Sequence, residues 1–139
     1  PEKLHGVIRE ILAPYPALAK GRIRIAGDDA PVDDRGATPM ALLVHELATN
    51  ASKYGALSVP EGQVEVTTKV DGEALELCWR ESGGPEIACP PDSTGFGTML
   101  SELSIVQQLG GRIDREWLRG GLVVRARVEL SRLVRSSAE

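Results

Sequence analysis

The chain has few cysteines and no long apolar run, and both absences limit what it can be. Cys78 and Cys89 are the only cysteines among its 139 residues, too few and too irregularly placed for a disulfide framework or a zinc site. They fit a reducing cytoplasm, where we expect the protein to act. Because no run of about 18 apolar residues and no signal-peptide pattern occurs, the sequence predicts no direct membrane insertion.

Basic residues are also in the minority. The chain has 16 Lys and Arg against 20 Asp and Glu, a formal net charge of -4 and a pI of about 5.3. Binding to the phosphate backbone of nucleic acid needs clustered Lys and Arg, so we expect no nucleic-acid partner. The apolar share of 42% is typical of a globular protein large enough for a hydrophobic core. We expect one domain over residues 1–131 and a frayed tail at 132–139. The start at Pro1, within a helical pattern, suggests a piece of a longer protein.

Apolar residues at helical spacing predict three helices. The first covers residues 3–13 and is ended by Pro-Tyr-Pro at 14–16. The second is long, with Thr38 as its N-cap, Pro39 in its first turn and its end near Tyr54. The third covers residues 98–109 and ends at two glycines.

Alternating residues predict strands between these helices. Residues 62–70 and 73–81 form a hairpin around Asp71-Gly72, and residues 112–118 and 122–130 form a second one. A short strand is expected at 22–26, with a brief one near Val32. Residues 82–97 hold four Gly and three Pro and predict a long loop of the kind that covers binding sites. This order predicts an α/β two-layer sandwich, a mixed, mainly antiparallel sheet with helices on one face.

One polar face of the long helix carries residues suited to phosphate and metal chemistry. At 100° per residue, Glu46, Asn50 and Lys53 fall within an arc of about 60°, beside the apolar stripe. A carboxylate and an amide one turn apart, followed by an ammonium, suit hydrated Mg²⁺ and a polyphosphate. The same three residues would also make an ordinary solvated helix face, so the helix alone leaves both interpretations open.

Two further features point in the same direction. Strand alternation places Glu81 in one row with Leu75, Leu77 and Trp79, just before the glycine-rich loop. A buried carboxylate there needs a donor, such as the exocyclic amine of a base, unless Glu81 simply points to solvent. The segment Gly95-Phe96-Gly97 leads into a helix, whose N-terminal amides attract phosphate, although glycines before a helix are common for packing reasons.

The two histidines are weaker candidates. His5 lies near the start of the first helix, and we expect it to be solvated at the surface. His45 lies about 100° from Glu46, off the polar face, and is interpreted as a structural or supporting residue and not as a nucleophile.

In this order, the motifs "HELATNASKYGALS", "WRESGGP" and "GFG" resemble the ATP-binding catalytic domain of bacterial sensor histidine kinases, in particular the HWE family. The resemblance covers nearly the whole chain. It implies the Bergerat-type ATP-binding fold of the GHKL superfamily, with ATP and Mg²⁺ as cofactors. His45, and Trp79 with Glu81, stand at the positions for which that family is named.

The resemblance also implies roles for individual residues. Asn50 resembles the Mg²⁺ ligand, and Glu46 the acidic residue near the γ-phosphate and the metal, a candidate base. Lys53 resembles a phosphate contact, and Tyr54 a residue lining the nucleotide pocket. Glu81 stands where the family has the carboxylate that accepts from adenine. The glycine boxes correspond to Gly83 and Gly84 and to Gly95, Phe96 and Gly97, with residues 85–94 between them as a short ATP lid.

The implied function is transfer of the γ-phosphoryl group to a His on a separate helical dimerisation domain, with a response regulator downstream in two-component signalling. The first helix shows no convincing phosphoacceptor motif. Two alternatives use related chemistry. One is an anti-sigma-factor-type serine kinase on the same fold, and the other is a nucleotide-binding interaction module that no longer transfers phosphate.

Overall fold

A five-stranded sheet forms the centre of the computed structural model, which describes residues 2–85 and 96–134, with residues 96–98 described by their backbone alone. The strands lie in the order β2 (Ile23–Gly27), β4 (Gln63–Asp71), β5 (Ala74–Ser82), β7 (Gly121–Glu129) and β6 (Arg112–Leu118). β2 runs parallel to β4, and every other neighbouring pair in this sheet is antiparallel. The predicted mixed, mainly antiparallel sheet is confirmed.

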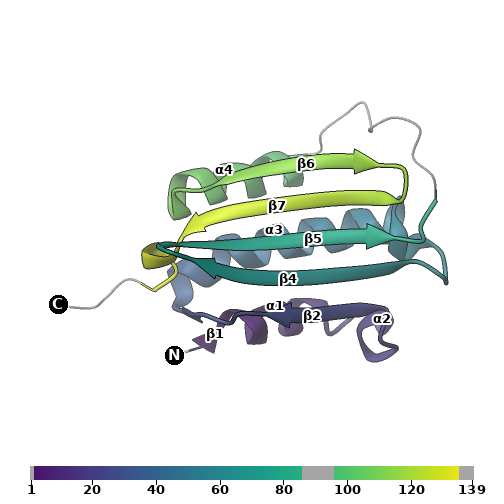
Figure 1. Ribbon diagram of the computed structural model, residues 1–139, viewed down its shortest axis with the longest axis horizontal. Helices are drawn as coiled ribbons and strands as arrows, with labels where there is room; N and C mark the ends of the chain where they lie inside the picture. Colours follow the sequence, from purple (N-terminus) through teal and green to yellow (C-terminus); the bar gives the residue numbers. More distant parts are fainter. Residues whose placement is uncertain (1, 86–95, 135–139) are drawn as a thin grey trace.

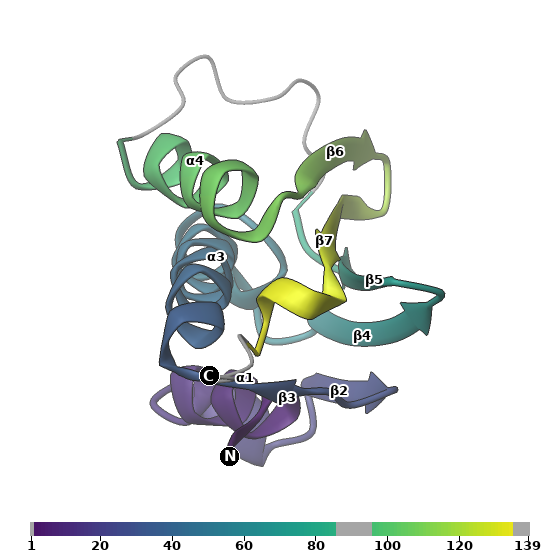
Figure 2. The same ribbon diagram turned by 90° about the vertical axis from the view of Figure 1, so that its left-hand side faces the viewer.

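Three helices cover one face of this sheet, which confirms the two-layer sandwich. They are α1 (Leu4–Leu12), α3 (Asp34–Lys53) and α4 (Phe96–Leu109), and Figure 2 shows them in one layer beside the strands. Shorter elements complete the described chain: β1 (Glu2–Lys3), α2 (Pro16–Ala19), β3 (Pro31–Val32), η1 (Ala56–Ser58) and η2 (Leu130–Arg132). β1 and β3 pair with each other in a small second sheet. In the described part of the chain, no helix is long and apolar enough to cross a membrane.

The core follows from the two periodicities of the sequence. Leu75, Leu77 and Trp79 alternate along β5 and are fully buried, because the alternate positions of a strand face the helices. The apolar stripe of α3 meets them with residues spaced three and four apart, and these are buried as well: Met40, Leu43, Val44, Leu47, Ala48 and Ala51. This arrangement places the polar face of α3 at the margin of the core.

The start of α3 differs from the prediction. The helix begins four residues before Thr38, and its N-cap is Asp33, whose side chain accepts a hydrogen bond from the Gly36 amide at 2.9 Å. Aspartate is as good an N-cap as serine or threonine, and the Asp33 amide is itself held by the Leu133 carbonyl at 2.9 Å. Thr38 lies inside the helix and donates to the Asp34 carbonyl at 2.9 Å, so the predicted N-cap was wrong.

His5 is also placed differently from the prediction. Its side chain is only 8% exposed, and its Nε2 lies 2.6 Å from the Thr68 hydroxyl oxygen on β4. The His5 amide donates to the Asp29 carboxylate at 2.9 Å. His5 therefore joins α1 to the sheet, and its predicted place at the solvated surface was wrong.

The packed region extends into the segment expected to fray. Leu133 is fully buried, and its carbonyl caps the start of α3, while a Cβ on Gly36 would lie 2.1 Å from the same carbonyl oxygen. Residues 135–139 lie outside the described residues. The division into a domain at 1–131 and a tail remains a prediction, but ordered packing continues at least to Leu133.

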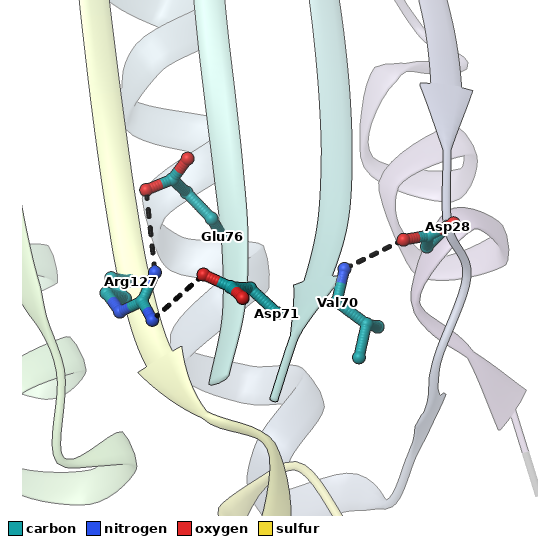
Figure 3. A network of polar contacts seen from close by, with 5 residues as sticks. All are labelled: Asp28, Val70, Asp71, Glu76 and Arg127. Carbon is teal, nitrogen blue, oxygen red and sulfur yellow. Dashed lines mark hydrogen bonds and ion pairs between the residues drawn. The ribbon is translucent and has the colours of Figure 1, made fainter. Parts of the chain in front are cut away.

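The opposite face of the sheet is charged. Figure 3 shows Arg127 on β7 between Asp71 and Glu76, at 3.4 and 3.9 Å, and Asp28 accepting from the Val70 amide. These ion pairs are well exposed, and each stabilises the fold by at most about 1 kcal/mol. A surface hollow of about 330 Å³ lies beside them, lined by Ala74, Gly110, Gly111, Arg112, Arg127, Val128 and Glu129. None of its lining residues belongs to the predicted site, whose residues Glu81, Gly83 and Gly84 lie at the other end of β5.

Candidate nucleotide site

The polar face of α3 forms the first part of the site. Glu46 and Asn50 are half-buried, and the Asn50 side-chain amide donates to a Glu46 carboxylate oxygen at 3.2 Å. One helical turn separates the two residues, so the hydrogen bond follows directly from their spacing. Lys53 and Tyr54 continue the same end of the helix and are exposed, Tyr54 to 63%. Glu46 and Asn50 thus form a hydrogen-bonded pair, with Lys53 at the surface beyond it, and their roles in a site stay a prediction.

The end of β5 forms the second part. Glu81 is 5% exposed, so its predicted alternative, a side chain pointing to solvent, is wrong. One of its carboxylate oxygens accepts from the Ala56 amide at 3.0 Å, and the other accepts from the indole nitrogen of Trp79 at 3.0 Å. A carboxylate oxygen has two acceptor positions, so each oxygen can accept one more hydrogen bond. The donor that a buried carboxylate needs is supplied by the protein itself.

These two hydrogen bonds were missed in the sequence prediction. The sequence contained a signal for the hydrogen bond from Trp79, because residues two apart on a strand point to the same face and the indole N–H is a donor. The Ala56 bond had none, because it joins residues 25 positions apart through the turn after α3.

Glycines allow the backbone to close around Glu81. A Cβ on Gly55 would lie 2.2 Å from a Glu81 carboxylate oxygen, and one on Gly121 would lie 2.2 Å from the Glu81 carbonyl oxygen. Gly84 packs against the other side of the same turn, where a Cβ would lie 2.6 Å from the Cα of Ala56. Gly83 has a φ of +72°, a backbone conformation that residues other than glycine rarely adopt. The end of β5 and the end of α3 therefore meet in one closely packed corner.

Burial raises the pKa of the Glu81 carboxyl, and the hydrogen bonds from Ala56 and Trp79 counteract part of that rise. Desolvation disfavours the charged form, whereas N–H donors stabilise it. Shifted carboxyl groups in such corners are common at functional sites.

The structure describes the remaining predicted site residues only in part. Gly95 and residues 86–94 of the expected lid lie outside the described residues, and Phe96 and Gly97 form the first turn of α4. His45 is exposed on α3, and its interpretation as a structural or supporting residue stays a prediction. Figure 1 shows that α4 runs in the opposite direction to β5, with its first turn toward the end of the sheet where β5 stops. This arrangement is compatible with one site bounded by α3, β5 and the start of α4.

The described residues hold no group of three or more His, Cys, Asp or Glu side chains arranged for a metal ion. Glu46 and Asn50 offer two oxygen-bearing side chains instead. Mg²⁺ is commonly held by one or two protein oxygens together with water and phosphate oxygens, so a pair of this kind suits it. The hydrogen bond between them uses the amide nitrogen of Asn50, which leaves the amide oxygen as the atom suited to the metal.

The fold has close counterparts among solved structures. The nucleotide-free catalytic domain of histidine kinase ThkA superposes with a TM-score of 0.69, covering 96% of this chain and 97% of that one at 18% identity. The histidine kinase domain of Erythrobacter litoralis EL346 blue-light activated histidine kinase gives a TM-score of 0.72 at 22% identity, covering 91% of this chain and 62% of that one. The chain has the fold of histidine kinase catalytic domains.

Sequence comparison supports the same class. The chain is 35% identical over 118 residues to Blue-light-activated histidine kinase 1 of Erythrobacter litoralis, and 36% identical over 117 residues to the Blue-light-activated histidine kinase of Brucella ovis. These matches cover 84% and 81% of this chain but 32% and 24% of the relatives, so it corresponds to about a third or less of each. No protein-family model matches the chain. Fold and sequence comparison thus agree: the chain has the fold of histidine kinase catalytic domains and is similar in sequence to part of these histidine kinases.

Proposed function

We propose that this domain binds ATP with Mg²⁺ and supplies the γ-phosphoryl group to a histidine on a separate helical dimerisation domain of the same kinase. The observation that carries the proposal is that two features of the fold lie next to each other. The hydrogen-bonded pair of Glu46 and Asn50 lies on the helix that ends beside the buried Glu81 carboxylate. On this proposal, a metal–phosphate group and a base would have separate binding surfaces on one helix–strand corner.

The polar face of α3 would hold the metal and the phosphates. The amide oxygen of Asn50 and the Glu46 carboxylate would bind Mg²⁺ directly or through water. Bound Mg²⁺ would neutralise charge on the phosphates, which is the main requirement of phosphoryl transfer. The exposed ammonium of Lys53 would contact phosphate oxygens, and the Glu46 carboxylate would be placed to accept the proton of the attacking group.

The corner at the end of β5 would hold the base. The free acceptor positions of the Glu81 carboxylate would receive the exocyclic amine of adenine, while Trp79 and Ala56 keep the carboxylate oriented. Tyr54 is exposed beside this corner and would line the pocket. Gly83 and Gly84 would let the base approach the backbone, and Gly95, Phe96 and Gly97 would place the amides of α4 toward the phosphates.

The proposed partners follow from the proposed reaction. The protein would act in the cytoplasm, and a response regulator would receive the phosphoryl group from the modified histidine. A solved structure of ThkA, in complex with response regulator protein TrrA, superposes on this chain with a TM-score of 0.67 at 18% identity. We also propose membership of the HWE family on the basis of His45 and of Trp79 with Glu81.

Calorimetry with ADP in the presence and absence of Mg²⁺ tests the proposal. We expect binding that depends on Mg²⁺ and that Asn50→Ala weakens by at least tenfold, a loss of about 1.4 kcal/mol. Glu102→Gln on α4 is the control, because Glu102 is an acidic residue paired with Arg115 and lies outside the proposed site. No heat of binding from the unaltered domain would disprove the proposal.

A second experiment tests the transfer. The domain is mixed with the helical dimerisation domain of its own kinase and labelled ATP. We expect label on the helical domain that is lost in acid, because phosphohistidine is acid-labile. Acid-stable label would indicate a serine kinase, and nucleotide binding without any label would indicate an interaction module.

A further inference from the structure

Arg22 directly precedes β2, and its guanidinium makes several hydrogen bonds to a single turn. Its Nε donates to the Gly62 carbonyl at 2.9 Å, and one Nη donates to the carbonyls of Val59 and of Ala56, the latter at 3.5 Å. The Arg22 backbone is held as well, because its carbonyl accepts from the Val64 amide at 2.8 Å. The guanidinium therefore spans the turn over residues 55–62 from one fixed point on the sheet.

The turn itself is tightly folded. Ser58 donates to the Gly55 carbonyl at 2.6 Å, and a Cβ on Gly62 would lie 1.7 Å from the Ala56 carbonyl oxygen. Because Gly62 lies against Ala56, the two ends of the turn are packed directly against each other. A change at the guanidinium is thus expected to reach the Ala56 amide.

The Ala56 amide is one of the two donors that hold the Glu81 carboxylate. Gly84, which follows the end of β5, packs against the same residue. Burial raises the pKa of Glu81, and the hydrogen bonds from the Ala56 amide and the Trp79 indole lower it. Arg22 is not among the causes of the shift. Any influence of Arg22 on the carboxylate therefore passes through the geometry of the turn.

We infer that Arg22 is a positioning residue of the site: it holds the turn at 55–62 so that the Ala56 amide orients the Glu81 carboxylate. A planar guanidinium suits this task, since its donors point in fixed directions and reach several carbonyls at once. The consequence for nucleotide selectivity rests on the proposed function, because it requires Glu81 to receive the base. The effect on the orientation of Glu81 does not.

The test compares Arg22→Gln with Arg24→Gln. Arg24 lies two residues further along on β2, is exposed and pairs in register with Glu65 of β4, outside the turn at 55–62, which makes it a matched control. NMR of the whole chain follows the Ala56 amide and the Trp79 indole N–H, with the Trp117 indole as internal reference. We expect Arg22→Gln to shift the Ala56 and Trp79 resonances and to speed hydrogen exchange of the Ala56 amide, while the Trp117 resonance stays unchanged. In Arg24→Gln, we expect the Ala56 and Trp79 resonances to stay unchanged as well.

Nucleotide titration then gives the functional result. We expect Arg22→Gln to weaken ADP binding about tenfold and to reduce the preference for ADP over GDP, with Arg24→Gln within twofold of the unaltered protein. Unchanged Ala56 and Trp79 resonances in a folded Arg22→Gln variant would overturn the inference, even if affinity fell. If Arg22→Gln does not fold, Arg22→Lys is measured in the same way, because an ammonium keeps the charge but lacks the planar fork. If the unaltered chain binds no nucleotide, the proposed function fails, whereas the resonances still decide the role of Arg22.

Discussion

Replacing Trp79 with phenylalanine tests the most distinctive contact of the site, the indole N–H that donates to Glu81. Trp79 is fully buried, and the indole nitrogen lies 3.0 Å from the carboxylate oxygen. Phenylalanine keeps an aromatic ring in the core but has no donor. The buried carboxylate then loses one of its two described hydrogen bonds.

The expected loss of stability has two parts. A hydrogen bond to a charged group contributes about 1.5–3 kcal/mol. Removing part of a fully buried ring costs a further 1–2 kcal/mol or so in packing. The sum is roughly 2.5–5 kcal/mol, a large share of the 5–15 kcal/mol or so that stabilises a typical domain. We therefore expect Trp79→Phe to fold, with a clearly lower free energy of unfolding.

Urea unfolding followed by far-UV circular dichroism measures this loss without relying on tryptophan fluorescence. Trp117→Phe is the control, because Trp117 packs against the core from β6 but is only partly buried. We expect its loss to stay near 1–2 kcal/mol or below. If Trp79→Phe costs no more than Trp117→Phe, the indole does not hold the Glu81 carboxylate as we argue.

Three further predictions concern the same corner and the long helix. The raised pKa of Glu81 means that the folded state keeps its proton to higher pH than the unfolded state, so the free energy of unfolding should decline as pH rises from about 4.5 toward the folded pKa. Glu81→Gln should flatten this decline in urea titrations between pH 4 and 8, and an identical pH profile would contradict the assignment. Gly55→Ala should destabilise by about 1–3 kcal/mol and weaken ADP binding, because its Cβ would lie 2.2 Å from Glu81, whereas Gly6→Ala on α1 meets nothing within 4 Å and should be neutral or stabilising. Asp33→Ala should lower the melting temperature through a loss of about 1 kcal/mol at the N-cap, and an unchanged melting temperature would show that the cap contributes nothing.

Local patterns were enough to predict the three long helices, the strands of the central sheet and their order, but not the short elements β1, α2, η1 and η2. Alternation on β5 and the three- and four-residue spacing on α3 are each set by neighbouring residues, so the buried faces were identified correctly. The hydrogen bond between Glu46 and Asn50 belongs to the same class, because one helical turn brings the two side chains together wherever the helix lies.

The start of α3 and the environment of His5 were predicted wrongly for one reason. Asp33 and Thr38 are both good N-caps by residue type, and the choice between them was decided by the Leu133 carbonyl from the far end of the chain. His5 is buried because Thr68 on β4 lies above it, 63 positions away in sequence. Neither contact leaves a trace in the local pattern.

The sequence by itself determined the two layers, the polar face of the long helix and a glutamate in the buried row of a strand. Tertiary structure alone decided what that glutamate contacts. Glu81 is held by an amide from the turn after α3, and that turn is held by Arg22 before β2. The physical reason is that a buried charge must find its donors among whichever backbone and side-chain groups the packed chain brings to it, and these come from segments that only the folded chain places side by side.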